Sequence, residues 1–216
     1  MLQLTLLWEG EMEIEAKFGV PDETTLQRLA QADELAGYRL QPGEVKRMHD
    51  VFLDTLDRKI LASGHVCRQR DFGDFISMTL KSGGTVQGAI HSREELMLTL
   101  PRIMPPREWP DSELRSAVLK LIGDDDLTAL FDQRQVRVVR SVTQADRVVG
   151  EFSADQVELS IGNRQRVYFE VEIELKEAGT LADLELLAAC LTNEWGLRAE
   201  PRSKFERALA FSSEAN

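Results

Sequence analysis

Cysteine is scarce in this chain, which excludes two common ways of stabilising a small protein. Only two cysteines, Cys67 and Cys190, occur among 216 residues, and they lie far apart in the sequence. A disulfide framework or a structural zinc site needs more cysteines at closer and more regular spacing. The three histidines are also scattered, with no pair at metal-ligand spacing. We therefore expect reduced thiols and a cytoplasmic protein.

Long apolar runs and excess positive charge are lacking as well. No apolar stretch of the sequence approaches the roughly 18–20 residues that a membrane helix needs, and the N-terminus has no basic region of the signal-peptide type. The formal net charge of −11 argues against nonspecific binding to DNA. We expect neither a membrane nor a nucleic acid as partner. The hydrophobic content of 43% still suffices for a folded core.

Alternating polar and apolar residues predict an α+β fold. The alternating segments follow one another closely along the chain, which favours antiparallel pairing over parallel strands joined by helices. About eight strands are enough to close an antiparallel β-barrel with flanking helices. We expect one domain over residues 1–216, with a core at about 11–212. The expected strands cover 11–18, 49–55, 64–71, 74–84, 90–100, 133–142, 146–159 and 166–177.

Capping residues and glycine stops indicate where the helices lie. Asp22 or Thr24 is expected to cap the first helix, Thr180 the fourth, and Pro201 to occupy the first turn of the last. The expected helices cover 21–35, 112–123, 180–196 and 201–211, with a further short helix at 124–132.

Charged residues gather on one face of the expected strands. Glu13, Glu15 and Lys17 share one parity, so a strand points all three to the same side. Later strands carry charges at the same spacing of two. In total six cations (Lys17, Arg68, Arg70, Lys81, Arg93 and Arg137) accompany six carboxylates (Glu13, Glu15, Glu95, Glu170, Glu172 and Glu174).

Two interpretations of these faces remain open. Each strand taken alone is typical of a solvated edge with cross-strand salt bridges. Turned inward together, however, the charges must be paired or must bind a ligand. Grouped carboxylates bind hard divalent cations, and arginine and lysine bind phosphate. A complex of a metal with a polyphosphate would satisfy both groups.

The ordered set of motifs resembles the CYTH domain, the superfamily of triphosphate tunnel metalloenzymes. The family signature E-x-E-x-K is present at residues 13–17, and HDVFLDT (with Asp54 and Thr55), CRQRD, TLKS, REEL, EVEIEL and SKFERAL follow in family order. The resemblance covers about residues 11–212. It implies an eight-stranded antiparallel tunnel that binds triphosphate together with Mg²⁺ or Mn²⁺.

The resemblance also implies roles for individual residues. The metal would be bound by Glu13, Glu15, Glu172 and Glu174. Triphosphate oxygens would be bound by Lys17, Arg68, Arg70, Lys81, Arg93 and Arg137. Lys204 on the last helix would join them, with an ordinary exposed lysine as the alternative interpretation. Glu95 or Glu170 would orient the attacking water.

The chain departs from the family pattern at two positions. Met97 stands where the family often has a further carboxylate, and Gln135 stands where it has a lysine. The segments EIEAKFGVPD and PREWPDS resemble CYTH domains that precede a CHAD domain. No CHAD helices follow within these 216 residues, which favours a stand-alone member or an excised domain.

The predicted activity is metal-dependent hydrolysis of a triphosphate, with inorganic tripolyphosphate as the leading substrate. A class IV adenylate cyclase acting on ATP and a thiamine triphosphatase are alternatives with the same fold. A non-catalytic module that binds polyphosphate or nucleotide is a third alternative, and a homodimer is a further expectation. Trp109, Trp195 and Cys67 are interpreted as packing residues. Asp155 is interpreted as a turn residue, with a strand end near the tunnel as the alternative.

Overall fold

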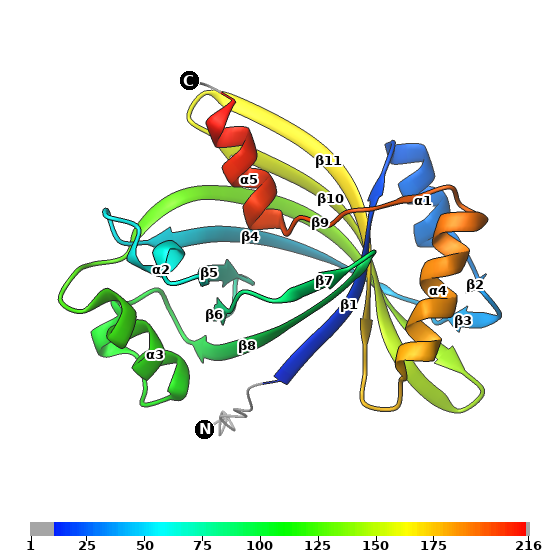
Figure 1. Cartoon of the computed structure of the whole chain (residues 1–216), viewed down its shortest axis with the longest axis horizontal. Helices are drawn as coiled ribbons and strands as arrows, with labels where there is room; N and C mark the ends of the chain where they lie inside the picture. Colours follow the sequence, from blue (N-terminus) through cyan, green and yellow to red (C-terminus); the bar gives the residue numbers. More distant parts are fainter. Residues whose placement is uncertain (1–10, 215–216) are drawn as a thin grey trace. The chain divides into compact units, whose positions relative to one another are not determined.

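The computed structural model describes residues 11–214, whose strands form one hydrogen-bonded sheet (Figure 1). The strands are β1 (Glu11–Val20), β2 (Glu34–Leu35), β3 (Tyr38–Leu40), β4 (Glu44–Asp54), β5 (Val66–Asp71), β6 (Ile76–Lys81), β7 (Thr85–Gln87), β8 (Ile90–Leu100), β9 (Thr128–Gln144), β10 (Arg147–Ile161), β11 (Arg164–Leu175) and β12 (Arg198–Ala199). The helices are α1 (Glu23–Gln31), α2 (Lys59–Ala62), η1 (Pro106–Glu108), α3 (Glu113–Ile122), α4 (Leu181–Asn193) and α5 (Lys204–Ser213).

Eight of the strands pair in a closed order. The order is β10-β11-β1-β8-β6-β5-β4-β9, and β9 pairs in turn with β10. The registers of β1–β11, β10–β11, β4–β5, β5–β6 and β6–β8 are antiparallel. The predicted α+β fold, an eight-stranded antiparallel β-barrel with helices, is therefore confirmed. The short strands β2, β3, β7 and β12 were not predicted and extend the sheet.

The described chain forms two compact units. Unit 1 contains Met12, Met48–Gly84 and Arg93–Gln133, and unit 2 contains 13–47, Thr85–Ser92 and 134–214. Each unit is described by itself below. Among the helices of residues 11–214, none combines the length and the apolar composition needed to cross a bilayer.

The core of unit 2 explains why the charges of β1 share one face. Ala16 and Phe18 point to the side where α1 and α4 pack, and they join Val171 and Ile173 of β11 in one apolar cluster. Because successive strand residues alternate in direction, Glu15 and Lys17 must point to the opposite side. Both faces of β1 are buried, since Lys17 is only 1% exposed. The charged face is therefore not a solvated edge.

The core of unit 1 is built on the same principle. Cys67, Met78 and Leu98 pack against α3 in a second apolar cluster, which also contains Trp109. Trp109 donates its indole N–H to the carbonyl of Met104 at 2.8 Å. The interpretation of Cys67 and Trp109 as packing residues is confirmed, and burial raises the pKa of the Cys67 thiol to about 12.

Side-chain caps begin most of the helices where the sequence predicts them. Asp22 accepts a hydrogen bond from the backbone N–H of Thr25 at 2.7 Å and begins α1. Ser112 begins α3, and Thr180 begins α4 with a capping box. The first helix is shorter than predicted, because the chain turns into β2 at Glu34.

The short helix predicted at 124–132 is wrong. Residues from Thr128 onward begin β9 instead, and the ring of Phe131 packs 5.2 Å from that of Phe52 on β4. The contact with a neighbouring strand outweighs a weak local helical preference.

The predicted place of Pro201 in the last helix is also wrong. Helix α5 begins only after Ser203, whose hydroxyl accepts from the backbone N–H of Glu206 in a capping box. The box satisfies the first free N–H groups of the helix, so the helix begins at Lys204 and Pro201 stays outside it.

Buried Arg140 joins β9 to the first helix within unit 2. Its guanidinium donates to the carbonyls of Ala30 (3.0 Å), Ala32 (2.6 Å), Leu40 (2.6 Å) and Gln41 (2.7 Å). A Cβ at Gly43 would lie 2.3 Å from the carbonyl oxygen of Val139, so only glycine allows this close approach. These contacts hold the strand that also carries Arg137.

We expect Arg140→Met to lower the free energy of unfolding by about 2–4 kcal/mol, because it leaves several buried carbonyls without a donor. Urea denaturation followed by circular dichroism measures the loss. Arg134→Met, on the same strand but exposed, is the matched control and should change stability by less than about 0.5 kcal/mol. Equal effects of the two changes would contradict this role for Arg140.

Candidate functional site

The register of three neighbouring strands in unit 2 gathers acidic residues on one face. Across β1, β11 and β10, Lys17 lies opposite Glu172, and Glu172 lies opposite Ser153. The next row pairs Glu170 with Asp155. Residues directly opposite in an antiparallel pair point to the same side. The acidic residues that these registers place on this face are Glu15, Glu151, Asp155, Glu170, Glu172 and Glu174.

Glu172 is the shared partner of three cations. Its Oε1 lies 3.0 Å from Nζ of Lys17 and 2.9 Å from Nζ of Lys204. Its Oε2 accepts from Nη2 of Arg137 at 2.5 Å. Arg137 also donates to both oxygens of Asp155, at 2.7 and 2.5 Å. Residues from β1, β9 and α5 therefore meet at one carboxylate of β11, and Asp155 of β10 shares Arg137 with it.

Helix α5 brings two cations to this face, and it runs alongside β11 in Figure 1. Lys204 forms ion pairs with Glu170, with Glu172 and with Asp155. Its side chain is only 10% exposed, so the interpretation of Lys204 as an ordinary exposed lysine is wrong. Arg207, one turn further on, donates to Glu170 at 2.8 Å.

Arg207 was missed by the sequence analysis. Its guanidinium lies over the ring of Tyr168, 3.6 Å from the centroid, and it also pairs with Glu170. The spacing of three between Lys204 and Arg207 places both on one side of a helix, and this was the signal available in the sequence.

The pKa values of these groups reflect their unequal surroundings. Burial alone would lower the pKa of Lys17, but Glu15 and Glu172 raise it to about 12. Burial alone would raise the pKa of Glu172, but its three cationic partners hold it well below the usual range. For Glu170 burial prevails, and its pKa is raised although Lys204 acts in the opposite direction. The pKa values of Glu170 and Glu172, two carboxyl groups of the same strand, are thus shifted in opposite directions.

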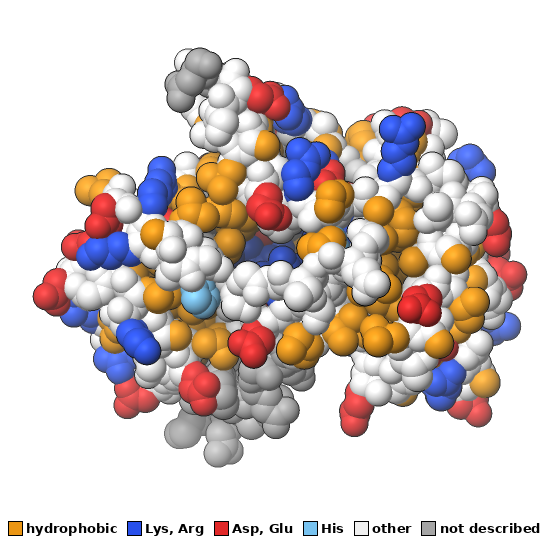
Figure 2. Space-filling view, viewed as in Figure 1, with side chains coloured by type: hydrophobic (Ala, Val, Ile, Leu, Met, Phe, Trp, Pro, Cys, Tyr) orange, Lys and Arg blue, Asp and Glu red, His pale blue; other side chains and the backbone are white. Residues whose placement is uncertain are grey.

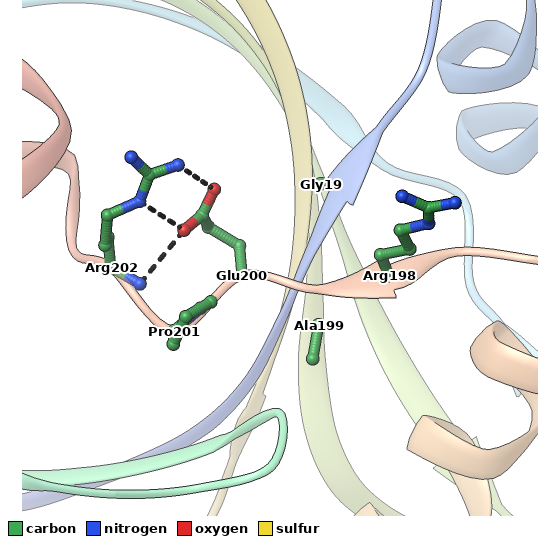
Figure 3. A pocket seen from close by; sticks show the side chains of 6 residues that line it. All are labelled: Gly19, Arg198, Ala199, Glu200, Pro201 and Arg202. Atoms are coloured by element: carbon green, nitrogen blue, oxygen red, sulfur yellow. Dashed lines mark hydrogen bonds and ion pairs between the residues drawn. The ribbon is translucent and has the colours of Figure 1, made fainter. Parts of the chain in front are cut away.

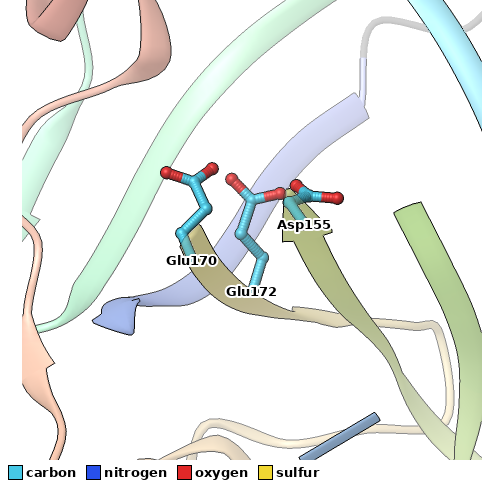
Figure 4. A group of neighbouring side chains, drawn as sticks. All are labelled: Asp155, Glu170 and Glu172. Carbon is cyan, nitrogen blue, oxygen red and sulfur yellow. The ribbon is translucent and has the colours of Figure 1, made fainter. Parts of the chain in front are cut away.

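Three carboxylates in this face could hold a metal ion. Oxygens of Asp155, Glu170 and Glu172 lie within 4.8 Å of one another, and all three residues are buried (Figure 4). An all-oxygen donor set suits a hard divalent cation such as Mg²⁺ or Mn²⁺. The donor chemistry of the described residues therefore fits the metal that the sequence analysis expected.

Of the four predicted metal ligands, only one belongs to this group of three carboxylates. Glu172 belongs to the group, whereas Glu15 pairs with Lys17 at 3.0 Å. Glu174 pairs with Lys176 at 2.7 Å and is more exposed. Glu13, half-buried on β1, is among the charges that raise the pKa of Glu174, after burial.

The interpretation of Asp155 as a turn residue is wrong. Asp155 lies in the middle of β10, is fully buried, and pairs with Arg137. On this face of β10, Ser153 lies between Glu151 and Asp155. The charges of β10 therefore do not recur at every second residue, as they do on β11, and Asp155 has only a weak periodic signal in the sequence.

Unit 1 contains a second charged face on β4, β5, β6 and β8. Arg70 donates to both oxygens of buried Asp50 at 2.6 and 2.7 Å. Arg68 lies 3.8 Å from the same carboxylate and 3.3 Å from the hydroxyl of Thr79. Lys81 pairs with Glu95 at 2.8 Å. Asp50 was not among the predicted site residues.

Arg93 and Met97 lie on β8 of the same unit. Met97 lies opposite Thr79, and its 53% exposure shows that no packing role requires a methionine there. Arg93 is half-buried on the same face by parity. The structure thus brings Arg68, Arg70, Lys81 and Glu95 together in unit 1, and Lys17, Arg137, Lys204, Glu15, Glu170 and Glu172 together in unit 2.

The outer surface and a pocket beside β12 are less distinctive. On the face shown in Figure 2, acidic and basic side chains are interspersed. A pocket of about 440 Å³ is lined by Gly19 and residues 198–202 (Figure 3). Within it, Glu200 accepts from the backbone N–H and from Nε of Arg202, both at 3.0 Å. Because these charges satisfy one another, the charged strand faces are the better candidate site.

Comparison with known proteins gives a family and a set of similar folds. The family model of the CYTH domain matches residues 11–209. No curated protein sequence matches the chain. A candidate adenylyl cyclase from Hippeastrum with a dominant triphosphatase activity is 21% identical, with a TM-score of 0.71 over 92% of this chain and 96% of the other.

Two further solved structures have similar folds. A candidate adenylate cyclase from Bacillus halodurans is 17% identical, with a TM-score of 0.63 over 91% of this chain and 97% of the other. The Mimivirus capping enzyme triphosphatase is 14% identical, with a TM-score of 0.51 over 88% and 89%. At these identities the likeness concerns the fold.

We expect Glu172→Gln to destabilise the metal-free protein at neutral pH, because a carboxylate with a lowered pKa stabilises the fold when ionised. The loss of unfolding free energy relative to wild type should be present above about pH 4.5. It should then narrow as the pH falls through the lowered pKa of the folded state. Urea unfolding midpoints in chelator, measured between pH 3 and 7, test this.

Glu170→Gln is the matched comparison, two residues away on the same strand. Its raised pKa stabilises the fold below about 4.5, and this contribution is lost as the pH rises through the pKa of the folded state. Glutamine resembles the protonated acid, so the stability of this variant relative to wild type should increase as the pH rises. If the stability difference from wild type changed with pH in the same direction in both variants, the opposite pKa shifts of Glu170 and Glu172 would be contradicted.

Proposed function

The chain belongs to the CYTH family, and we propose that it is a metal-dependent triphosphatase whose leading substrate is inorganic tripolyphosphate. The observation that carries the proposal is the buried cluster of Lys17, Arg137 and Lys204 around Asp155, Glu170 and Glu172.

A purely structural role explains this cluster poorly. Removing charges from water costs several kcal/mol per ion, and well-packed apolar residues of similar volume often stabilise a fold equally well or better. Unit 2 already has an apolar core on the opposite face of the same strands. The charges are therefore better explained by a ligand that carries charge of both signs.

A divalent cation and a triphosphate together have this property. Asp155, Glu170 and Glu172 would hold the cation, whose charge would neutralise phosphate oxygens and favour departure of the leaving diphosphate. Carboxylates engaged in this way release Lys17, Arg137 and Lys204, whose N–H groups then bind anionic oxygens. Arg68, Arg70 and Lys81 of unit 1 offer the same chemistry.

Hydrolysis then depends on positioning and electrostatics. Phosphoryl transfer needs little covalent participation from the protein, and donors fixed around the transferring group stabilise its developing charge. Of the two carboxylates considered for orienting water, Glu170 is the better candidate. Its raised pKa suits a group that accepts a proton.

An organic triphosphate is the second candidate, and one observation favours it. Phe72 and Phe75 stack at 4.7 Å between β5 and β6, and the guanidinium of Arg70 lies 6.0 Å from the ring of Phe72. A half-exposed aromatic pair beside an arginine could accept a base. Trp109 and Tyr168 are covered by other groups, which favours the inorganic substrate.

We expect phosphate release from tripolyphosphate with Mg²⁺ or Mn²⁺, and slower release from ATP and thiamine triphosphate. Arg137→Gln should lower kcat by about 100-fold, because a fixed donor to the transferring group is lost. The control is Arg134→Gln, an exposed neighbour on the same strand, which should keep wild-type activity. If the wild-type protein releases no phosphate with either metal, the proposed activity is wrong.

Metal binding can be tested without turnover. Mg²⁺ or Mn²⁺ should raise the melting temperature of the wild-type protein, since a ligand that binds only the folded state stabilises it. Asp155→Asn should weaken the metal affinity by at least about 10-fold. Glu177→Gln, an exposed carboxylate just after β11, is the control. Equal metal shifts in both variants would place the metal elsewhere.

A further inference from the structure

Gln133 is a buried polar residue that the proposed mechanism does not use. Its side chain on β9 is 0% exposed. Neither Oε1 nor Nε2 has a hydrogen-bond partner within residues 11–214. The described ion pairs and side-chain hydrogen bonds of unit 1 therefore do not include this carboxamide.

Such a residue needs an explanation, because nearly all buried polar groups in native proteins are hydrogen-bonded. A carboxamide has two N–H donors and an acceptor oxygen, and burying them without partners destabilises the folded state. An apolar side chain of the same size would leave no buried donor or acceptor without a partner. Gln133 is thus a local departure from stability of the sort found at functional sites.

The position of Gln133 relates it to the charged face of unit 1. Phe131 and Phe52 are in ring contact, so they point to the same side of the β4–β9 pair. Gln133, two residues after Phe131, shares that side, and the alternating burial of β9 supports this. On β4 and β5, Phe52 lies opposite Arg68, and Asp50 lies opposite Arg70.

The neighbouring charges on this face are already paired. Arg70 binds both oxygens of Asp50, and Lys81 binds Glu95. Gln133 differs from them because it is neutral and lies outside this network. A neutral donor can bind a phosphoryl oxygen without first being released from a carboxylate.

We propose that Gln133 is a contact residue of the bound triphosphate. Its Nε2 donates to a phosphoryl oxygen, and its Oε1 accepts from a water or from a protonated phosphate oxygen. The inference rests on the proposed function and adds a residue and a chemistry to it. It assigns a fixed, uncharged amide to the charged face of unit 1.

The test uses a substitution whose effects on stability and binding have opposite signs. Gln133→Met keeps the size of the side chain and removes its polar atoms. We expect the melting temperature of the ligand-free protein to rise by about 2–6 °C, because an unsatisfied buried group is lost. We expect the affinity for tripolyphosphate, measured by calorimetry, to fall by about 10-fold.

Gln41→Met is the matched control. The amide of Gln41 already donates to the hydroxyl of Thr143 at 2.8 Å, so its loss should lower the melting temperature or leave it unchanged. The affinity for tripolyphosphate should stay at the wild-type value.

The outcomes separate the inference from the proposed function. If wild type binds and hydrolyses tripolyphosphate while Gln133→Met keeps its affinity, the inference is overturned and the proposed function stands. A lower melting temperature or a failure to fold in Gln133→Met would show a structural amide and also overturn the inference. If wild type binds no tripolyphosphate, the proposed function falls and the inference falls with it.

Discussion

The charged face of unit 2 depends on one carboxylate. Glu172 accepts from Lys17, Arg137 and Lys204 at once, and these residues come from β1, β9 and α5. No isolated pair could be buried so deeply at low cost, because each ion would keep most of its desolvation penalty. Because several elements bring their charges to β11, these charges stay paired and buried in the absence of ligand. A ligand that carries charge of both signs would fit at this place.

The parity of the strands could be predicted from the sequence, and so could most of the charged residues. Alternation places Glu15 and Lys17 opposite Ala16, and it requires no knowledge of which strand is the neighbour. The confirmed fold follows from the same patterns and from the ordered motifs. Helix caps such as Asp22 and Thr180 were also predictable, because a cap is decided by residues only three positions apart.

The partners of those charges could not be predicted. Asp50 and Asp155 lie on β4 and β10, and only the register with β5 or β11 brings them to Arg70 or Glu170. The start of β9 was wrongly predicted as a helix for a related reason, since Phe131 is placed by its contact with Phe52 on another strand. Local patterns decide which way a side chain points. Register decides what it meets, and register is a property of distant segments.

The arrangement of charges also has a consequence for the order of folding during synthesis. Asp155, Glu170 and Glu172 are translated before Lys204 and Arg207, and one of the two partner strands of β11 is β1, near the other end of the chain. A growing chain therefore carries these carboxylates before two of their cations exist. Pairing of such distant segments is slow, and Lys204 and Arg207 can join this face only after every strand that carries its carboxylates has been made.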